Sequence, residues 1–183
     1  MSIRTRRLKR DEEKLVSELG TSEHVTLKAV SGDPTDHYQV IYHVNGIMWD
    51  DSAGTASPTT DHVVDIYLPP GYPKQPPRCI MRTPIWHPNI GDYVCIGDFW
   101  SAGVTLADIV AHIGEMIQYM SYNLRSPVNK SAAQWAQRNQ SAFPIGNKNI
   151  RPPDSEEEQS TAVQIERPGD DVEITLGPIR DRE

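Results

Sequence analysis

The sequence has few cysteines and no long apolar run, and each scarcity excludes a class of protein. Only Cys79 and Cys95 occur in 183 residues, without a CxxC spacing, so neither a disulfide framework nor a cysteine-rich zinc site is expected. No apolar stretch is long enough to cross a bilayer, and the basic N-terminus lacks the apolar segment of a secretory signal. These features favour a protein of the reducing cytoplasm that does not bind a membrane.

Charge is distributed unevenly along the chain. Residues 151–183 carry four Arg against ten Asp and Glu, whereas residues 1–150 carry fourteen Lys and Arg against fifteen Asp and Glu. The sequence has no basic stripe of the kind that binds nucleic acid. This change of composition predicts one domain over 1–150 and an acidic, disordered tail over 151–183. Within the tail, residues 172–176 have the pattern either of a strand that pairs with a partner or of an apolar patch in a disordered chain.

The apolar pattern of the first half predicts a helix followed by a sheet. A helix is expected over 5–19, with Leu8, Leu15 and Leu19 on one face and Val16 beside them. Runs rich in β-branched and aromatic residues predict a four-stranded antiparallel meander over 24–30, 38–44, 62–68 and 78–82. The domain is therefore expected to be of the α+β class.

Two irregular segments and two helices complete the predicted domain. Residues 49–60 are polar and predict a loop. Residues 83–103 have no clear period and contain three Gly and two Pro, and an irregular segment of this length inside a domain is usually functional. Thr105 and Asp108 form a capping box for a long helix, and a short helix is expected over 131–139. The apolar stripe of the long helix consists of Leu106, Ile109, Val110, Ile113, Met116, Ile117 and Met120.

One thiol lies near one carboxamide in the irregular segment 83–103. Cys95 follows the tripeptide His87-Pro88-Asn89 by six residues. A thiol can hold an acyl group, and an amide donor can stabilise the oxyanion that forms when that group is transferred. The spacing therefore predicts an acyl-carrier site. Two alternatives stay open, namely that Cys95 is a buried structural thiol and that Asn89 only bonds the backbone of its own turn.

These residues, in this order, resemble the ubiquitin-conjugating enzyme family over roughly residues 6–142. The resemblance is carried by the run Tyr72-Pro73-Lys74-Gln75-Pro76-Pro77, the segment TPIWHPNI at 83–90, Cys95, Trp100-Ser101 and Ser126-Pro127. It implies the ubiquitin-conjugating fold: an N-terminal helix, a four-stranded antiparallel meander, an active-site loop, a long central helix and a short C-terminal helix.

The resemblance also implies a chemistry. An activating enzyme, which uses ATP, hands the C-terminal glycine of ubiquitin or a ubiquitin-like protein to Cys95, and an amine of a target protein then attacks the thioester. The resemblance gives this chain no metal and no cofactor. Two alternatives are a catalytically silent module of the same fold that binds a ubiquitin-like protein, and an unrelated cysteine hydrolase in which His87 is the base.

The resemblance assigns roles to the residues around the thiol. Asn89 matches the family's oxyanion asparagine, which also braces the active-site loop, and His87 matches a structural position rather than a base. Pro88 sets the turn, Trp100 is expected beneath the active-site loop, and Asp98 is an acidic neighbour of the thiol.

Two further positions are assigned less directly. Ser126 aligns with the position that orients or desolvates the incoming amine, but two extra residues between Trp100 and Ser126 leave Asn123 as an alternative. Cys79 stands in the predicted strand 78–82, where the family carries an apolar core residue, so we expect it to be packed and unreactive.

Two surfaces are candidates for binding partner proteins. The basic face of the first helix, formed by Arg6, Arg7, Lys9, Arg10 and Lys14, matches the surface where the family docks its activating enzyme, although an ordinary solvated helix face explains it equally well. Lys74 stands where family members that bind RING-type ligases carry an apolar residue, and burial of its charge in an apolar interface would be costly. We therefore expect no RING-type ligase, or an unusual one.

The predicted active-site loop is shorter than in most eukaryotic members of the family. The stretch from Asn89 to Cys95 is two residues shorter, the stretch from Cys95 to Trp100 is three residues shorter, and the family's Tyr-x-Gly-Gly signature is absent from 49–60. Divergence of this kind is similar to bacterial relatives encoded beside an activating enzyme, a ubiquitin-like protein and a JAB-type peptidase, in clusters associated with defence against phage.

Overall fold

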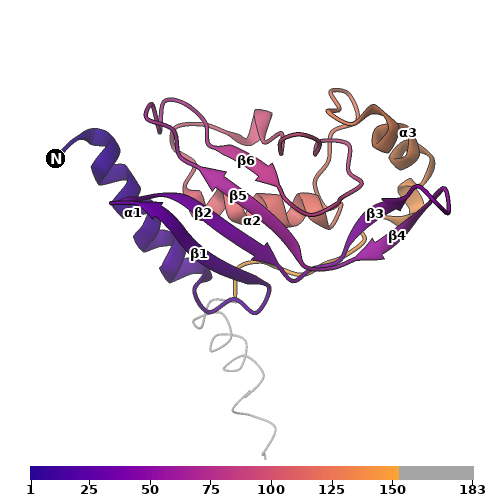
Figure 1. Ribbon diagram of the computed structural model, residues 1–183, viewed down its shortest axis with the longest axis horizontal. Helices are drawn as coiled ribbons and strands as arrows, with labels where there is room; N and C mark the ends of the chain where they lie inside the picture. Colours follow the sequence, from indigo (N-terminus) through magenta and orange to yellow (C-terminus); the bar gives the residue numbers. More distant parts are fainter. Residues whose placement is uncertain (153–183) are drawn as a thin grey trace, which may run out of the picture. The chain divides into compact units, whose positions relative to one another are not determined.

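The computed structural model describes residues 1–152, which form a helix, a sheet, a two-stranded ribbon and two further helices (Figure 1). The helices are α1 (Ile3–Leu19), α2 (Leu106–Ile117) and α3 (Lys130–Arg138). The sheet contains β1 (Val25–Gly32), β2 (Thr35–Tyr42), β5 (His62–Tyr67) and β6 (Arg78–Met81), hydrogen-bonded in that order and antiparallel throughout. The expected α+β class and the four-stranded antiparallel meander are confirmed. The acidic tail predicted over 151–183 lies outside the described residues, apart from its first two.

The core lies between the sheet and α2. Tyr38, Val40 and Tyr42 alternate along the central strand β2 and are all buried, as expected when one face of an antiparallel strand packs on a helix. The Tyr42 hydroxyl donates a hydrogen bond to the Val110 carbonyl of α2 at 3.0 Å, which satisfies the buried hydroxyl. The core therefore fixes the position of α2 against the sheet.

The predicted capping box starts α2, and the predicted apolar stripe covers most of its buried face. The Thr105 hydroxyl accepts a hydrogen bond from the Asp108 backbone N–H, and the Asp108 carboxylate accepts one from the Thr105 N–H. Six of the seven stripe residues are buried. Met120 is the exception: it is 48% exposed and follows the end of the helix, so its assignment to the stripe is wrong. Over residues 1–152 no helix has the length and apolar composition needed to span a membrane.

The loop predicted over 49–60 is wrong, because most of this segment belongs to a β-ribbon. Strands β3 (Gly46–Asp50) and β4 (Thr55–Thr59) pair antiparallel. The Trp49 ring stacks on Trp86 with centroids 4.8 Å apart, so the ribbon packs against the segment that leads into the tripeptide 87–89. Strand β4, with the sequence TASPT, is short and polar and has a single β-sheet neighbour, which is why its composition carries so weak a strand signal.

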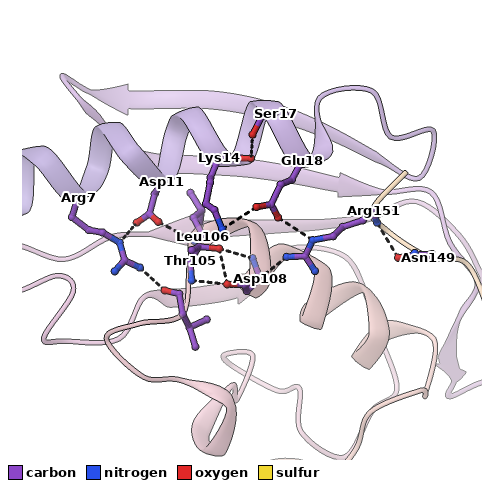
Figure 2. A network of polar contacts seen from close by, with 11 residues as sticks. Arg7, Asp11, Lys14, Ser17, Glu18, Thr105, Leu106, Asp108, Asn149 and Arg151 are labelled. Atoms are coloured by element: carbon purple, nitrogen blue, oxygen red, sulfur yellow. Dashed lines mark hydrogen bonds and ion pairs between the residues drawn. The ribbon is translucent and has the colours of Figure 1, made fainter. Parts of the chain in front are cut away.

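One member of the predicted basic face of α1 points inward. The side chain of Arg7 is only 16% exposed, and its guanidinium bonds the carboxylate of Asp11, itself buried, at 2.7 Å (Figure 2). It also donates to the carbonyl of Ala102, at 2.6 Å, and to that of Val104. The placement of Arg7 on the solvated face is therefore wrong. Arg7 instead joins α1 to the segment that leads into α2.

A second polar group joins α1 to α2 near the end of the described chain. The Arg151 guanidinium bonds Glu18 of α1 at 3.0 Å and Asp108 of α2 at 2.6 Å (Figure 2). The neighbouring Ile150 is buried in the core. Arg151 therefore belongs with the folded residues rather than with the acidic segment whose first residue it was expected to be.

Candidate active site

Cys95 lies in the irregular segment between β6 and α2, close to the tripeptide 87–89. Its backbone N–H donates to the Asn89 carbonyl at 2.9 Å, and the preceding residue, Val94, donates to the carbonyl of Cys79 in β6 at the same distance. Isolated bridges pair His87 with Ile90 and Ile90 with Val94. These bonds hold the thiol beside the asparagine without a regular strand or helix.

The Cys95 thiol is half-buried and lies between two cavities. The first cavity has a volume of about 480 Å³ and lies between the active-site segment and the C-terminal half of α2. The second, of about 450 Å³, lies between the active-site segment and the start of β6. Both are lined by Cys95, Ile96 and Gly97. The alternative of a sealed structural thiol therefore does not describe Cys95.

The Asn89 side chain lines the first cavity and is bonded to the segment after α2. Its Oδ1 accepts from the Asn123 backbone N–H at 2.7 Å, and its Nδ2 donates to the Asn123 carbonyl at 2.9 Å. A longer bond, 3.4 Å, runs from Nδ2 to the Ser126 carbonyl. Asn89 therefore braces residues 123–126 against the active-site segment, as the family resemblance implied.

His87 is buried and its ring is engaged with the protein interior. Its Nδ1 accepts a hydrogen bond from the Asn89 backbone N–H at 3.1 Å, and its ring meets the Tyr119 ring edge-on at 4.7 Å. Burial lowers the pKa of His87 to about 3, because the imidazolium form would have to be desolvated. His87 lines neither cavity beside Cys95. This environment argues against a Cys95–His87 catalytic pair.

The predicted amine-orienting position and its alternative lie on the same wall. Ser126 and Asn123 both line the first cavity. The wall is held to the active-site segment at a second point, because the Pro88 carbonyl accepts from the Val128 and Asn129 N–H groups at 2.8 and 2.9 Å. Both candidate positions therefore lie at the cavity.

Asp98 and Trp100 lie on different sides of the thiol. Asp98 is exposed, belongs to a 3₁₀ turn (Gly97–Phe99) and lines the first cavity. Trp100 lines the second cavity and packs against Tyr72, with ring centroids 5.7 Å apart. Tyr72 in turn bonds Asp11 and Arg7 of α1. Contacts therefore run from Arg7 through Tyr72 to Trp100, which lies next to the active-site segment.

The two cysteines have opposite environments. Cys79 is 2% exposed in β6, and burial raises the pKa of its thiol to about 12. A thiol with that pKa has almost no thiolate at neutral pH, and the thiolate is the nucleophile. Of the two thiols, only Cys95 is open to a reaction partner.

The remaining candidates for partner contact are on the surface. Arg6, Lys9 and Arg10 are exposed on α1, whereas Lys14 is half-buried and pairs with Glu18 at 3.1 Å. Lys74, at the position discussed for RING-type ligases, is also exposed.

Helix α2 contributes His112 and Met116 to the first cavity, which was not expected from the sequence. Phe99 and Tyr122, from the segments on either side of α2, also line it together with Cys95. A signal for His112 was present, because it follows Ile109 by three residues and precedes Met116 by four, and this spacing puts the three on one helix face. A histidine on an otherwise apolar helix face is a candidate for hydrogen bonding or proton transfer.

Comparison with known proteins agrees with this geometry. Residues 28–149 match the family model described as "Ubiquitin-conjugating enzyme". The chain is 35% identical over 60 residues to "Ubiquitin-conjugating enzyme E2 27" of Arabidopsis thaliana, a match that covers 30% of this chain and 31% of that protein. The structure of S. cerevisiae Ubc12 shares the fold, with a TM-score of 0.55 at 22% identity over 78% of this chain and 74% of that one. The chain belongs to the ubiquitin-conjugating enzyme family.

Proposed function

We propose that this protein carries ubiquitin or a ubiquitin-like protein as a thioester on Cys95 and passes it to an amine of a target protein. The observation that carries the proposal is the position of the thiol. Cys95 is accessible between two cavities, and the wall of the first presents Asn89, Asn123 and Ser126. A thiol that exchanges acyl groups between proteins must be reached by a chain end and by an amine, and two openings at one sulfur allow both.

The reaction divides into two acyl transfers. In the first, the Cys95 thiolate attacks the thioester carbonyl on the activating enzyme, whose sulfur leaves as a thiolate. In the second, an amine attacks the carbonyl carbon on Cys95, the C–S bond breaks, the sulfur leaves as a thiolate, and the amine nitrogen loses a proton. The attack of the amine passes through an oxyanion, which the Asn89 amide stabilises by about 3 kcal/mol if it acts like other oxyanion-hole donors. For this, Nδ2 exchanges its 3.4 Å bond to the Ser126 carbonyl for one to the oxyanion.

The partners follow from the same proposal. The activating enzyme, which supplies the ATP-dependent step, docks on the exposed basic side of α1, at Arg6, Lys9 and Arg10, with Lys14 at its edge. Lys74 disfavours a RING-type ligase. No nucleic acid and no membrane take part, and the reaction takes place in the cytoplasm. The bacterial antiviral setting stays a prediction.

A thiol hydrolase is the second candidate, and the geometry disfavours it. A hydrolase needs a base within hydrogen-bond reach of the sulfur. The His87 Nδ1 is already bonded to the Asn89 N–H, and the ring is sealed from both cavities. A catalytically silent binding module is the third candidate, and the accessible Cys95 speaks against it.

A gel run without reductant tests the proposal. The protein is incubated with ATP, an activating enzyme and its ubiquitin-like protein. We expect an adduct that thiols remove, a thiol-resistant ester with Cys95→Ser, and no adduct with Cys95→Ala. Cys79→Ala is the matched control, because Cys79 is buried and its removal leaves Cys95 in place. An adduct that persists in Cys95→Ala would show that the acyl group is held elsewhere.

A further inference from the structure

The side chain of His112 is held in one orientation at the edge of the first cavity. It is 14% exposed, and its ring stacks on Phe99 with centroids 4.0 Å apart and an interplanar angle of 8°. Phe99 belongs to the 3₁₀ turn that follows Cys95 by two residues. The ring is therefore placed by the same turn that carries the chain away from the thiol.

The two ring nitrogens of His112 have different surroundings. Nδ1 lies 3.4 Å from the Glu115 carboxylate one helical turn later on α2. An Nδ1–H that faces a carboxylate leaves the lone pair on Nε2. Within residues 1–152, Nε2 makes no hydrogen bond, and it is not among the sealed polar atoms that lack a partner. His112 thus has an acceptor nitrogen that is neither sealed nor hydrogen-bonded, and the residue lines the same cavity as Cys95.

Two carboxylates and one neutral histidine lie around His112. Glu115 lies on α2, Asp98 lies in the 3₁₀ turn and lines the same cavity, and His87, behind the wall, is neutral above pH 3 or so. Burial lowers the pKa of His112, while the bond and the charge of Glu115 raise it in part. The ring is therefore neutral at pH 7, and the carboxylate of Glu115 stabilises the imidazolium when a proton arrives.

We propose that His112 accepts the proton that the amine loses when the modifier is transferred from Cys95. This inference rests on the proposed function. As the amine nitrogen bonds to the thioester carbonyl carbon, it carries a positive charge and becomes acidic. Its proton passes to the lone pair of Nε2, directly or through one water. The oxyanion then collapses, the C–S bond breaks, and the electron pair leaves on the Cys95 sulfur. His112⁺ returns its proton to solvent.

A second role of the ring must be separated from this one. Stacking on Phe99 also supports the turn after Cys95, and a substitution could act through that support alone. His112→Phe keeps an aromatic ring against Phe99 but has no acceptor nitrogen. His112→Gln keeps a polar side chain next to Glu115 but cannot act as a base at neutral pH. Proton acceptance predicts that both variants fail alike, whereas support of the turn predicts that His112→Phe retains the wild-type rate.

The experiment is a single-turnover discharge of the Cys95 thioester to free lysine between pH 4.5 and 8. Only the uncharged amine attacks, so the logarithm of the rate rises with pH at a slope of one. In the wild type, protonated His112 cannot accept the proton of the amine. The logarithm of the discharge rate should therefore rise with pH at a slope of two at the acid end of the range. We expect both variants to keep a slope of one throughout and, at pH 7.5, to discharge at least about 10-fold more slowly, since general base catalysis contributes about 100- to 10,000-fold.

Two further variants complete the test. Glu115→Gln removes the charge that raises the pKa of His112, so the steep part of the profile moves to lower pH. His43→Gln is the matched control, because the exposed His43 also pairs with a carboxylate, Asp61 at 2.7 Å, and lines neither cavity beside Cys95. We expect its profile to match the wild type. Thermal unfolding of each variant checks that the fold is intact.

The outcomes separate the two proposals. If the wild type forms no thioester at Cys95, the proposed function and this inference both fail. Suppose that the wild type and all variants form the thioester. If His112→Gln and His112→Phe then discharge it at the wild-type rate and slope, only the inference about His112 fails. If His112→Phe alone is fully active, His112 supports the turn and accepts no proton.

Discussion

Asn89 and Asn123 exchange two hydrogen bonds across the first cavity, from the Asn123 N–H to Oδ1 at 2.7 Å and from Nδ2 to the Asn123 carbonyl at 2.9 Å. The Asn89 side chain thus ties residues 123–126 to the active-site segment. We expect Asn89→Ala to slow discharge to lysine by about 100-fold, from the lost oxyanion donor, and to slow loading less. Single-turnover rates of both steps measure this. Equal slowing of the two steps would show that Asn89 only braces the active-site segment. Faster hydrogen exchange of the Asn123 backbone amide in Asn89→Ala would show that the segment after α2 has lost this support.

Cys79 gives a prediction about thiol reactivity. A thiol with a pKa of about 12 is almost wholly protonated at pH 8, so an alkylating reagent should modify one cysteine per folded chain. The labelled residue should be Cys95, as identified by peptide mass. Cys79→Ala should load normally and lose about 1 kcal/mol of stability from the vacated core volume. Equal labelling of both thiols in the folded protein would contradict the assignment.

Arg7 and its exposed neighbours on α1 should respond differently to substitution. Arg7→Gln leaves the buried Asp11 carboxylate without its cation, and we expect a loss of about 3 kcal/mol in the free energy of unfolding. Arg6→Gln, Lys9→Gln and Arg10→Gln combined should leave that free energy nearly unchanged and raise the KM for the activating enzyme by roughly 10-fold, because exposed charges act on encounter. Denaturant titration and loading kinetics distinguish the two effects. A KM that does not change would remove the exposed face from the docking surface.

Acid should destabilise the fold in a window set by its buried histidines. The pKa of His87 is about 3 in the folded chain and near 6.5 in the unfolded chain, so the unfolded chain binds this proton first. The contribution of His87 to the free energy of unfolding is fully present above about pH 6.5. It is lost by up to about 1.4 kcal/mol per pH unit as the pH falls toward 3. Burial also lowers the pKa of His62, so protonation of His62 in the unfolded chain adds to the loss of stability in acid.

His87→Gln tests this window. The variant should be less stable than the wild type at pH 7 and lose stability less steeply between pH 6 and 4, as measured by urea unfolding at each pH. His43→Gln, at an exposed histidine, is the control and should follow the wild-type curve. The same acid slope in His87→Gln would show that another group causes the loss.

Lys74 gives a prediction about ligases. If no RING-type ligase takes part, Lys74→Phe should not raise the rate of discharge, alone or with such a ligase added. Lys28→Phe, at an exposed position on β1, controls for the added apolar surface. A gain of rate in Lys74→Phe that requires the ligase would show that this surface is a ligase site weakened by one charge.

The sequence was sufficient where the signal is local or depends on order along the chain. The 3.6-residue period set the buried faces of α1 and α2, the capping box set the start of α2, and β-branched runs located the four sheet strands. The order of the YPxxPP run, the HPN tripeptide and Cys95 indicated the family. Each of these features depends on a few neighbouring residues or on a fixed spacing.

Tertiary structure decided the features that depend on distant contacts. Arg7 turns inward because its acceptors are the carbonyls of Ala102 and Val104, and the ribbon over 46–59 packs on a distant segment through the stack of Trp49 on Trp86. His112 joins the active site because α2 packs under the turn at Phe99. A period along the chain says which face of an element is apolar, but not which polar side chains distant segments will satisfy or expose. That is fixed only when the elements pack.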